Sequence, residues 1–88
     1  MTEQYIFFAD PGHAWLRVPK KEVMPIKDKI SSYSYMNGKY VYLEEDCDAS
    51  VFLIHKFGSF EKAKSFVTEK YTEKTAIRDY NNFNPDFL

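Results

Sequence analysis

Cysteine is almost missing from this chain of 88 residues. Its one cysteine, Cys47, cannot form a disulfide within the chain, and a thiolate-rich zinc site needs two or more cysteines. We therefore expect a reducing compartment and no structural zinc, and no motif in the sequence calls for a cofactor.

An excess of positive charge is also lacking, because 12 Lys and Arg residues face 13 Asp and Glu residues for a net charge of −1. Binding to nucleic acid or to an anionic membrane is usually driven by a basic excess, so the charge balance argues against both partners.

Long apolar runs are absent as well. The longest, residues 6–9 and 51–54, are far shorter than the roughly 20 residues that span a bilayer. The first residues are acidic and polar, which does not fit a signal peptide. These features predict a cytoplasmic protein that makes no contact with a membrane.

Aromatic residues are what the chain has in quantity, at 18% of positions. Large rings bury much area per residue, so a chain this short can build a core without a metal or disulfide. Splitting it would leave pieces too small for a core, and we expect residues 1–88 to form a single domain.

The first half reads as β structure. An apolar run at residues 4–9 ends at Asp10-Pro11-Gly12, and a second run follows at 14–18, which predicts an antiparallel pair. Pro19 suits the first position of a short helix over 20–24, which Pro25 would end.

A hairpin is predicted over residues 30–45, because Asn37-Gly38 is a preferred two-residue turn of type I′. With those two residues at the turn, Tyr35 faces Tyr40 and Tyr33 faces Tyr42. Alternation then places one set of side chains on a single face of the sheet: Tyr33, Tyr35, Tyr40 and Tyr42.

Helical signals follow the hairpin. Acidic residues precede a helix expected over 46–57, Gly58 ends it, and Ser59 caps a second helix over 60–71. Residues 75–88 look like a docked arm with a short strand near Ile77. The predicted fold is α+β, an antiparallel sheet of three or four short strands with two C-terminal helices packed on one face.

Three segments resemble a group of short uncharacterised proteins of bacteriophages, prophages and plasmids. They read DPGHxWLxVP from Asp10, ISSYSY from Ile30 and YLEEDCD from Tyr42, and they lie in the first half to two-thirds of the chain. The resemblance implies a bacterial mobile element and a bacterial host. It implies no activity and no site residue.

His13 is a candidate for acid–base chemistry or metal binding, because Asp10 could orient its ring. A turn that Asp10 opens through its own side chain explains the same residues without chemistry.

The acidic run Glu44, Glu45, Asp46 and Asp48 offers the oxygen ligands that magnesium and calcium prefer. With His13 it would outline a metal-dependent hydrolase or nuclease. Two other interpretations stay open: a helix cap with solvated neighbours, or an acidic patch for a basic partner.

The hairpin tyrosines could stack flat rings, could pack under a helix, or could anchor a protein partner as Tyr and Trp often do. We interpret the chain as a non-enzymatic protein that binds a host protein, such as an inhibitor of a bacterial defence system. The alternatives are the hydrolase and a binder of small molecules or nucleotide signals, and an exposed hairpin edge also permits a homodimer. The predicted binding residues are His13, Trp15, Tyr33, Tyr35, Tyr40, Tyr42, Glu44, Glu45 and Asp46.

Overall fold

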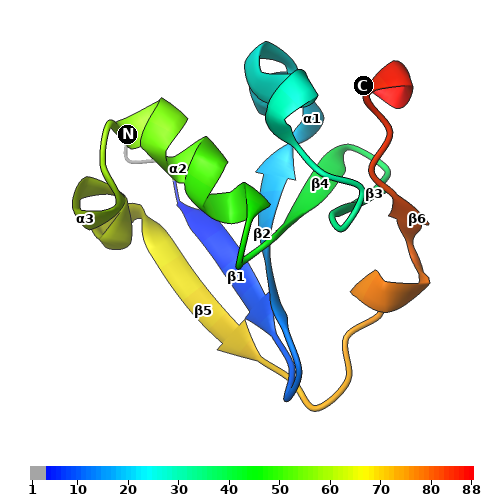
Figure 1. The fold of residues 1–88 in the computed structure, drawn as a ribbon. Coiled ribbons are helices and arrows are strands. Elements are labelled where there is room, and N and C mark those ends of the chain that lie inside the picture. Colours follow the sequence, from blue (N-terminus) through cyan, green and yellow to red (C-terminus); the bar gives the residue numbers. More distant parts are fainter. Residues whose placement is uncertain (1–3) are drawn as a thin grey trace.

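The computed structural model describes residues 4–88 and contains one six-stranded sheet with its α-helices on one side (Figure 1). Its strands lie in the order β5-β1-β2-β4-β3-β6. Their bounds are β1 Tyr5–Ala9, β2 Ala14–Pro19, β3 Tyr35–Asn37, β4 Tyr40–Glu44, β5 Val67–Tyr71 and β6 Asn81–Asn82.

Short helical segments connect the strands. The α-helices are α1 Lys20–Val23, α2 Asp48–Phe57 and α3 Phe60–Ala63, and the 3₁₀ helices are η1 Met24–Lys29, η2 Lys64–Phe66, η3 Ile77–Asp79 and η4 Pro85–Phe87. Pro19 closes β2 and precedes α1, and Pro25 lies in the first turn of η1 instead of ending the helical segment. Among the described residues, no helix is long and apolar enough to cross a membrane.

The predicted fold class is right as far as α+β and wrong in its sheet and helices. The helix expected over 60–71 ends at Ala63, and Val67–Tyr71 instead forms β5, which pairs in parallel with β1. The sheet is therefore mixed and six-stranded, with α2 as the one long helix of the C-terminal half. Pairing with β5 covers an edge of β1 that would otherwise carry open hydrogen-bonding groups.

The hairpin is confirmed, but its predicted register is wrong. Asn37 pairs with Tyr40, so Gly38 and Lys39 form the two-residue loop, and Tyr35 faces Tyr42. Gly38 has a φ of 59°, and none of the non-glycine residues in 4–88 has a positive φ. A positive φ at the first loop residue alone fits a type II′ turn, whereas type I′ needs it at both.

The hairpin's first strand is also shorter than expected, because residues 31–34 form a turn and β3 begins at Tyr35. Tyr33 therefore lies in that turn. Tyr35, Tyr40 and Tyr42 share one face of the sheet, as the register pairs show. The four-tyrosine ladder does not exist.

Two apolar clusters lie on opposite faces of the sheet. On the helical face, Leu16, Val18 and Leu43 pack against Phe52 and Leu53 of α2, all at 1% exposure or less. On the other face a smaller cluster gathers Trp15, Tyr42 and Ile77 with half-buried rings around them. The second cluster exists because segment 75–80 folds back over strands β2 and β4.

The C-terminal arm is docked, as predicted, although residue 77 lies in η3 and the short strand is Asn81–Asn82. β6 pairs with β3, and Phe83 enters the main core at 5% exposure. The chain then ends beside η1, next to α1 in Figure 1. The arm closes one edge of the sheet and completes both clusters.

Candidate functional site

A hollow of about 410 Å³ opens at the ends of strands β2, β3 and β4. We call it the aromatic–acidic cleft. It is lined by His13, Trp15, Tyr33, Tyr35, Glu44, Asp46, Cys47 and Arg78. Six of these were predicted as binding residues, namely His13, Trp15, Tyr33, Tyr35, Glu44 and Asp46.

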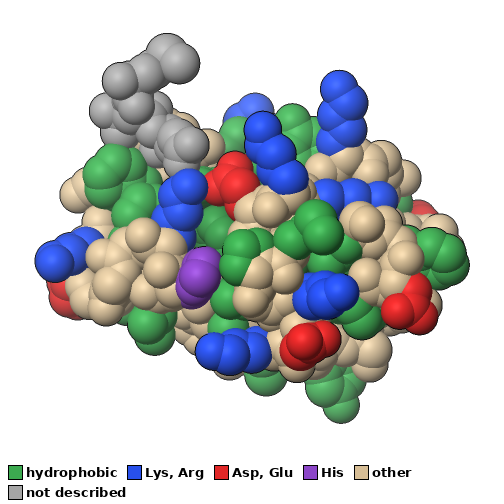
Figure 2. All heavy atoms as spheres, turned by 90° about the horizontal axis from the view of Figure 1, so that it is seen from above, with side chains coloured by type: hydrophobic (Ala, Val, Ile, Leu, Met, Phe, Trp, Pro, Cys, Tyr) green, Lys and Arg blue, Asp and Glu red, His purple; other side chains and the backbone are tan. Residues whose placement is uncertain are grey.

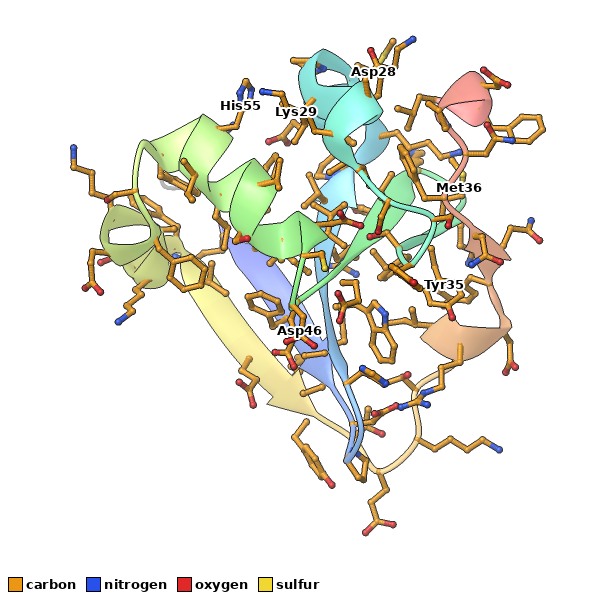
Figure 3. All side chains as sticks on the ribbon, viewed as in Figure 1. Asp28, Lys29, Tyr35, Met36, Asp46 and His55 are labelled. Atoms are coloured by element: carbon orange, nitrogen blue, oxygen red, sulfur yellow. The ribbon has the colours of Figure 1, made fainter. Side chains whose placement is uncertain are left out.

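Strand pairing explains why these residues meet. Trp15 of β2 lies directly opposite Glu44 of β4, so the two side chains project from the same face. β3 adds Tyr35, and the loop after β4 adds Asp46. In Figure 3, Asp46 lies near the end of α2 that is opposite to His55.

The wall of the cleft is aromatic. The Trp15 ring lies 6.2 Å from the Tyr35 ring in an edge-on arrangement and 5.9 Å from the His13 ring. Tyr33 stands at the mouth and is 72% exposed. Of the three large rings, Tyr33 is largely open to a ligand, Tyr35 is half-buried and Trp15 forms the buried back of the wall.

One polar atom of the wall lacks a partner. Trp15 is 2% exposed, and its Nε1 has no hydrogen-bond acceptor among residues 4–88. A buried donor left unpaired costs about 1–3 kcal/mol. Trp15 therefore carries a buried hydrogen-bond donor that no group among residues 4–88 satisfies.

The positive charge of Arg78 is already paired within the fold. Its guanidinium donates Nη2 to Asp10 Oδ1 at 2.7 Å and Nε to Asp10 Oδ2 at 3.1 Å, while its Cζ lies 5.4 Å from the Trp15 ring centre. A Cβ at Gly12 would lie 2.9 Å from Nη2, so glycine there permits the close approach. The hydrogen bond from Arg78 holds the pKa of Asp10 well below its ordinary value.

Asp10 does not orient the His13 ring, which the hydrolase hypothesis required. Its Oδ1 accepts the backbone N–H groups of Gly12 and His13, both at 3.0 Å, and its Oδ2 also accepts from Thr75. The prediction that Asp10 opens a turn through its side chain is confirmed. Among residues 4–88, no group of three His, Cys, Asp or Glu side chains is arranged to hold a metal ion.

The four carboxylates of the acidic run have different surroundings. Glu44 and Asp46 line the cleft, and Glu45 is exposed beside it. Burial and then the charges of Asp46 and Glu44 raise the pKa of Glu45. Burial and then the same kind of acidic neighbours raise the pKa of the Cys47 thiol. Both shifts agree with a negative potential at this corner.

Asp48 is structural. It is 2% exposed, and it accepts hydrogen bonds from the Ser31 hydroxyl at 2.6 Å, the Ser34 hydroxyl at 2.5 Å and the Ser31 N–H. The Ser34 hydroxyl in turn accepts the N–H of Glu44 at 3.0 Å. This network holds the 31–34 turn, and thus Tyr33, against the ends of β4 and α2.

Besides Glu45, two predicted binding residues do not line the cleft, Tyr40 and Tyr42. Tyr42 is 8% exposed and packs against Tyr80 with ring centres 5.1 Å apart, and burial raises its pKa. The guanidinium of Arg17 lies between the rings of Tyr40 and Phe8, 4.7 and 5.3 Å from their centres. Both tyrosines belong to the second apolar cluster and its rim.

Sequence reasoning missed Arg78 and Cys47 as cleft residues. Arg78 lies far along the chain from Asp10, and only the fold of the arm brings the two together. Cys47 stands beside the acidic residues that were singled out, so its place in the same corner could have been inferred.

Comparisons with protein-family models, with curated proteins and with solved structures find no match.

Proposed function

We propose that this chain is a non-enzymatic binding protein that docks on another protein through the aromatic–acidic cleft and its rim. The observation that carries the proposal is that Trp15, Tyr33 and Tyr35 meet Glu44 and Asp46 in one hollow. Aromatic anchors in a concave, partly desolvated patch are the usual energetic centre of a protein interface.

The origin and partner rest on the sequence resemblance. Its three segments are similar to short proteins of phages, prophages and plasmids, which suggests a partner in the bacterial host and action in its cytoplasm. Inhibition of a host defence protein is one role that simple docking can perform without catalysis.

A capture experiment tests the proposal. Tagged protein is incubated with bacterial lysate, and the captured proteins are quantified for wild type, for Tyr33→Ala with Tyr35→Ala, and for Tyr71→Ala. Tyr71 is a matched control, because it is 62% exposed but lies on β5 at the far edge of the sheet.

We expect one host protein to be captured stoichiometrically by wild type and by the Tyr71 variant, and at least tenfold less by the double cleft variant. Purified partner and wild type should then form a complex of defined mass. Equal capture by all three proteins would contradict the proposal.

A further inference from the structure

The charged side chains of the aromatic–acidic cleft that are not engaged in ion pairs among residues 4–88 are negative. Glu44 and Asp46 line it, and neither is recorded in an ion pair among residues 4–88. The cation of the cleft, Arg78, is engaged by the buried carboxylate of Asp10. An incoming anion would meet two carboxylates and a neutralised arginine, whereas an incoming cation would meet favourable charge.

Among residues 4–88, no lysine lines the cleft, and Arg78 is the arginine that does. Figure 2 shows Lys and Arg side chains spread over the side that carries α1 and α2, with fewer acidic ones between them. Neither of these helices contributes a side chain to the cleft, so their lysines do not line it beside Glu44 and Asp46.

Aromatic rings make the same cleft suitable for a cation. The electron-rich faces of Trp and Tyr attract positive groups, and the attraction grows where water is partly excluded. Trp15 and Tyr35 form the wall and Tyr33 the mouth. Rings and carboxylates in one hollow are the two elements that hold a cationic side chain.

We propose that the aromatic–acidic cleft receives an arginine side chain of the partner protein, held by the tyrosine rings and by Glu44 and Asp46. This inference rests on the proposed function and names the chemistry of the residue that the cleft recognises.

A guanidinium fits better than an ammonium for two reasons. It is planar, so it can stack on a ring while its N–H groups reach a carboxylate, whereas an ammonium is a compact and strongly hydrated point charge. The same face of the sheet already holds Arg17 between two rings and Arg78 over Trp15.

A peptide also supplies what an isolated guanidinium lacks. The backbone on either side of an inserted arginine can contact the rim of the cleft, where His13 and Tyr33 are exposed, and its amide groups can hydrogen-bond there. We therefore expect the cleft to favour arginine within a polypeptide over free arginine.

Trp15 is the single tryptophan of the chain, so its fluorescence reports on the cleft directly. The probe is a short blocked peptide with one central arginine among glycines. The controls are the same peptide with citrulline, which is a neutral isostere, or with lysine, and free arginine amide. We expect the arginine peptide to bind at least tenfold more tightly than the citrulline peptide and more tightly than both cationic controls.

Variants of the full chain test whether Glu44 and Asp46 bind the arginine of the peptide. Glu44→Gln with Asp46→Asn removes both charges at nearly constant size and should weaken the arginine peptide at least tenfold. Glu73→Gln removes an exposed carboxylate outside the cleft and should leave binding unchanged. Circular dichroism and thermal melting check that each variant is folded.

Equal binding of the arginine and citrulline peptides, or full binding by the Glu44/Asp46 variant, would overturn the inference. Equal binding of the lysine and arginine peptides would also overturn it, because the cleft would then not prefer a guanidinium to an ammonium. If no peptide binds while capture of the host protein still depends on Tyr33 and Tyr35, the arginine inference is wrong and the proposed function stands. If the arginine peptide binds but capture is independent of those tyrosines, only the proposed function fails.

Discussion

Asp46 and Asp48 stand two residues apart in the same acidic run and perform different tasks. Asp46 is exposed in the cleft, whereas Asp48 is buried under the hydroxyls of Ser31 and Ser34. The sequence alone could not distinguish the two residues. The serines that cover Asp48 lie in the 31–34 turn, which the sequence pattern predicted to be part of a strand.

We predict that Asp48→Ala lowers the free energy of unfolding by about 2–4 kcal/mol, because it leaves the Ser31 N–H and two hydroxyls without their charged acceptor. Asp46→Ala should change stability by less than about 0.5 kcal/mol, as expected for an exposed position. Urea denaturation of both variants tests the contrast, and equal losses would contradict it.

The pairing of Asp10 with Arg78 predicts a pH dependence of stability. Because the folded pKa of Asp10 is lowered from 3.8, its stabilising contribution is present above that value and is lost as the pH falls through the lower folded pKa. Asp10→Asn should therefore melt below wild type at neutral pH, and the gap should narrow in acid below pH 3.8.

Melting curves across that range measure the gap. Asp86→Asn is the control, because Asp86 is exposed and its side chain forms no ion pair among residues 4–88. A gap that stays constant with pH would show that Asp10 acts through shape and not through its charge.

At the scale of elements, sequence patterns located most of the fold. The β1–β2 pair, the hairpin, α2 with Gly58 at its end and the Ser59 cap of α3 all follow from local signals. The strand Val67–Tyr71 could not be predicted from local signals, because the spacing of its apolar residues also fits a helix. Only pairing with β1, which lies more than half the chain away, makes it a strand.

The turn between β3 and β4 yields an element-scale prediction. Gly38 has a φ of 59°, and a Cβ there would meet nothing within 4 Å, so backbone strain alone opposes a side chain. Gly38→Ala should cost about 1–2 kcal/mol of unfolding free energy.

Lys39→Ala should cost less than about 0.5 kcal/mol, because Lys39 has an ordinary φ in the type II′ loop. Thermal denaturation of the pair measures the difference. Equal costs at both positions would contradict the type II′ geometry of the Gly38-Lys39 loop.

At the scale of the whole molecule, the C-terminal arm is part of the core. Phe83 is 5% exposed and donates its N–H to Ser34 at 2.8 Å, whereas Phe87 is 70% exposed. Phe83→Ala should lower the free energy of unfolding by about 3–5 kcal/mol, as for other buried phenylalanines.

Phe87→Ala is the matched control and should change stability by less than about 1 kcal/mol. Chemical denaturation of the two variants decides between an integral arm and a loosely attached one. Similar small effects would mean that the arm contributes little to the fold.

The candidate site was predictable in part. Local reasoning selected Trp15, Tyr35, Glu44 and Asp46, and strand register brings them together. Local reasoning could not tell that Tyr33 lines the cleft whereas Tyr42 is buried in the second cluster. That difference depends on the residue at which β3 begins. Local reasoning also could not find Arg78, whose place depends on how the arm folds across the sheet.

The strand order has a consequence for synthesis. Both outer strands, β5 and β6, are made after the four inner ones, which are complete at residue 44. A growing chain that has not yet reached residue 67 therefore presents two unpaired margins, each able to template association with a neighbouring chain. Both margins are covered only when Val67–Tyr71 has paired with β1 and Asn81–Asn82 has paired with β3.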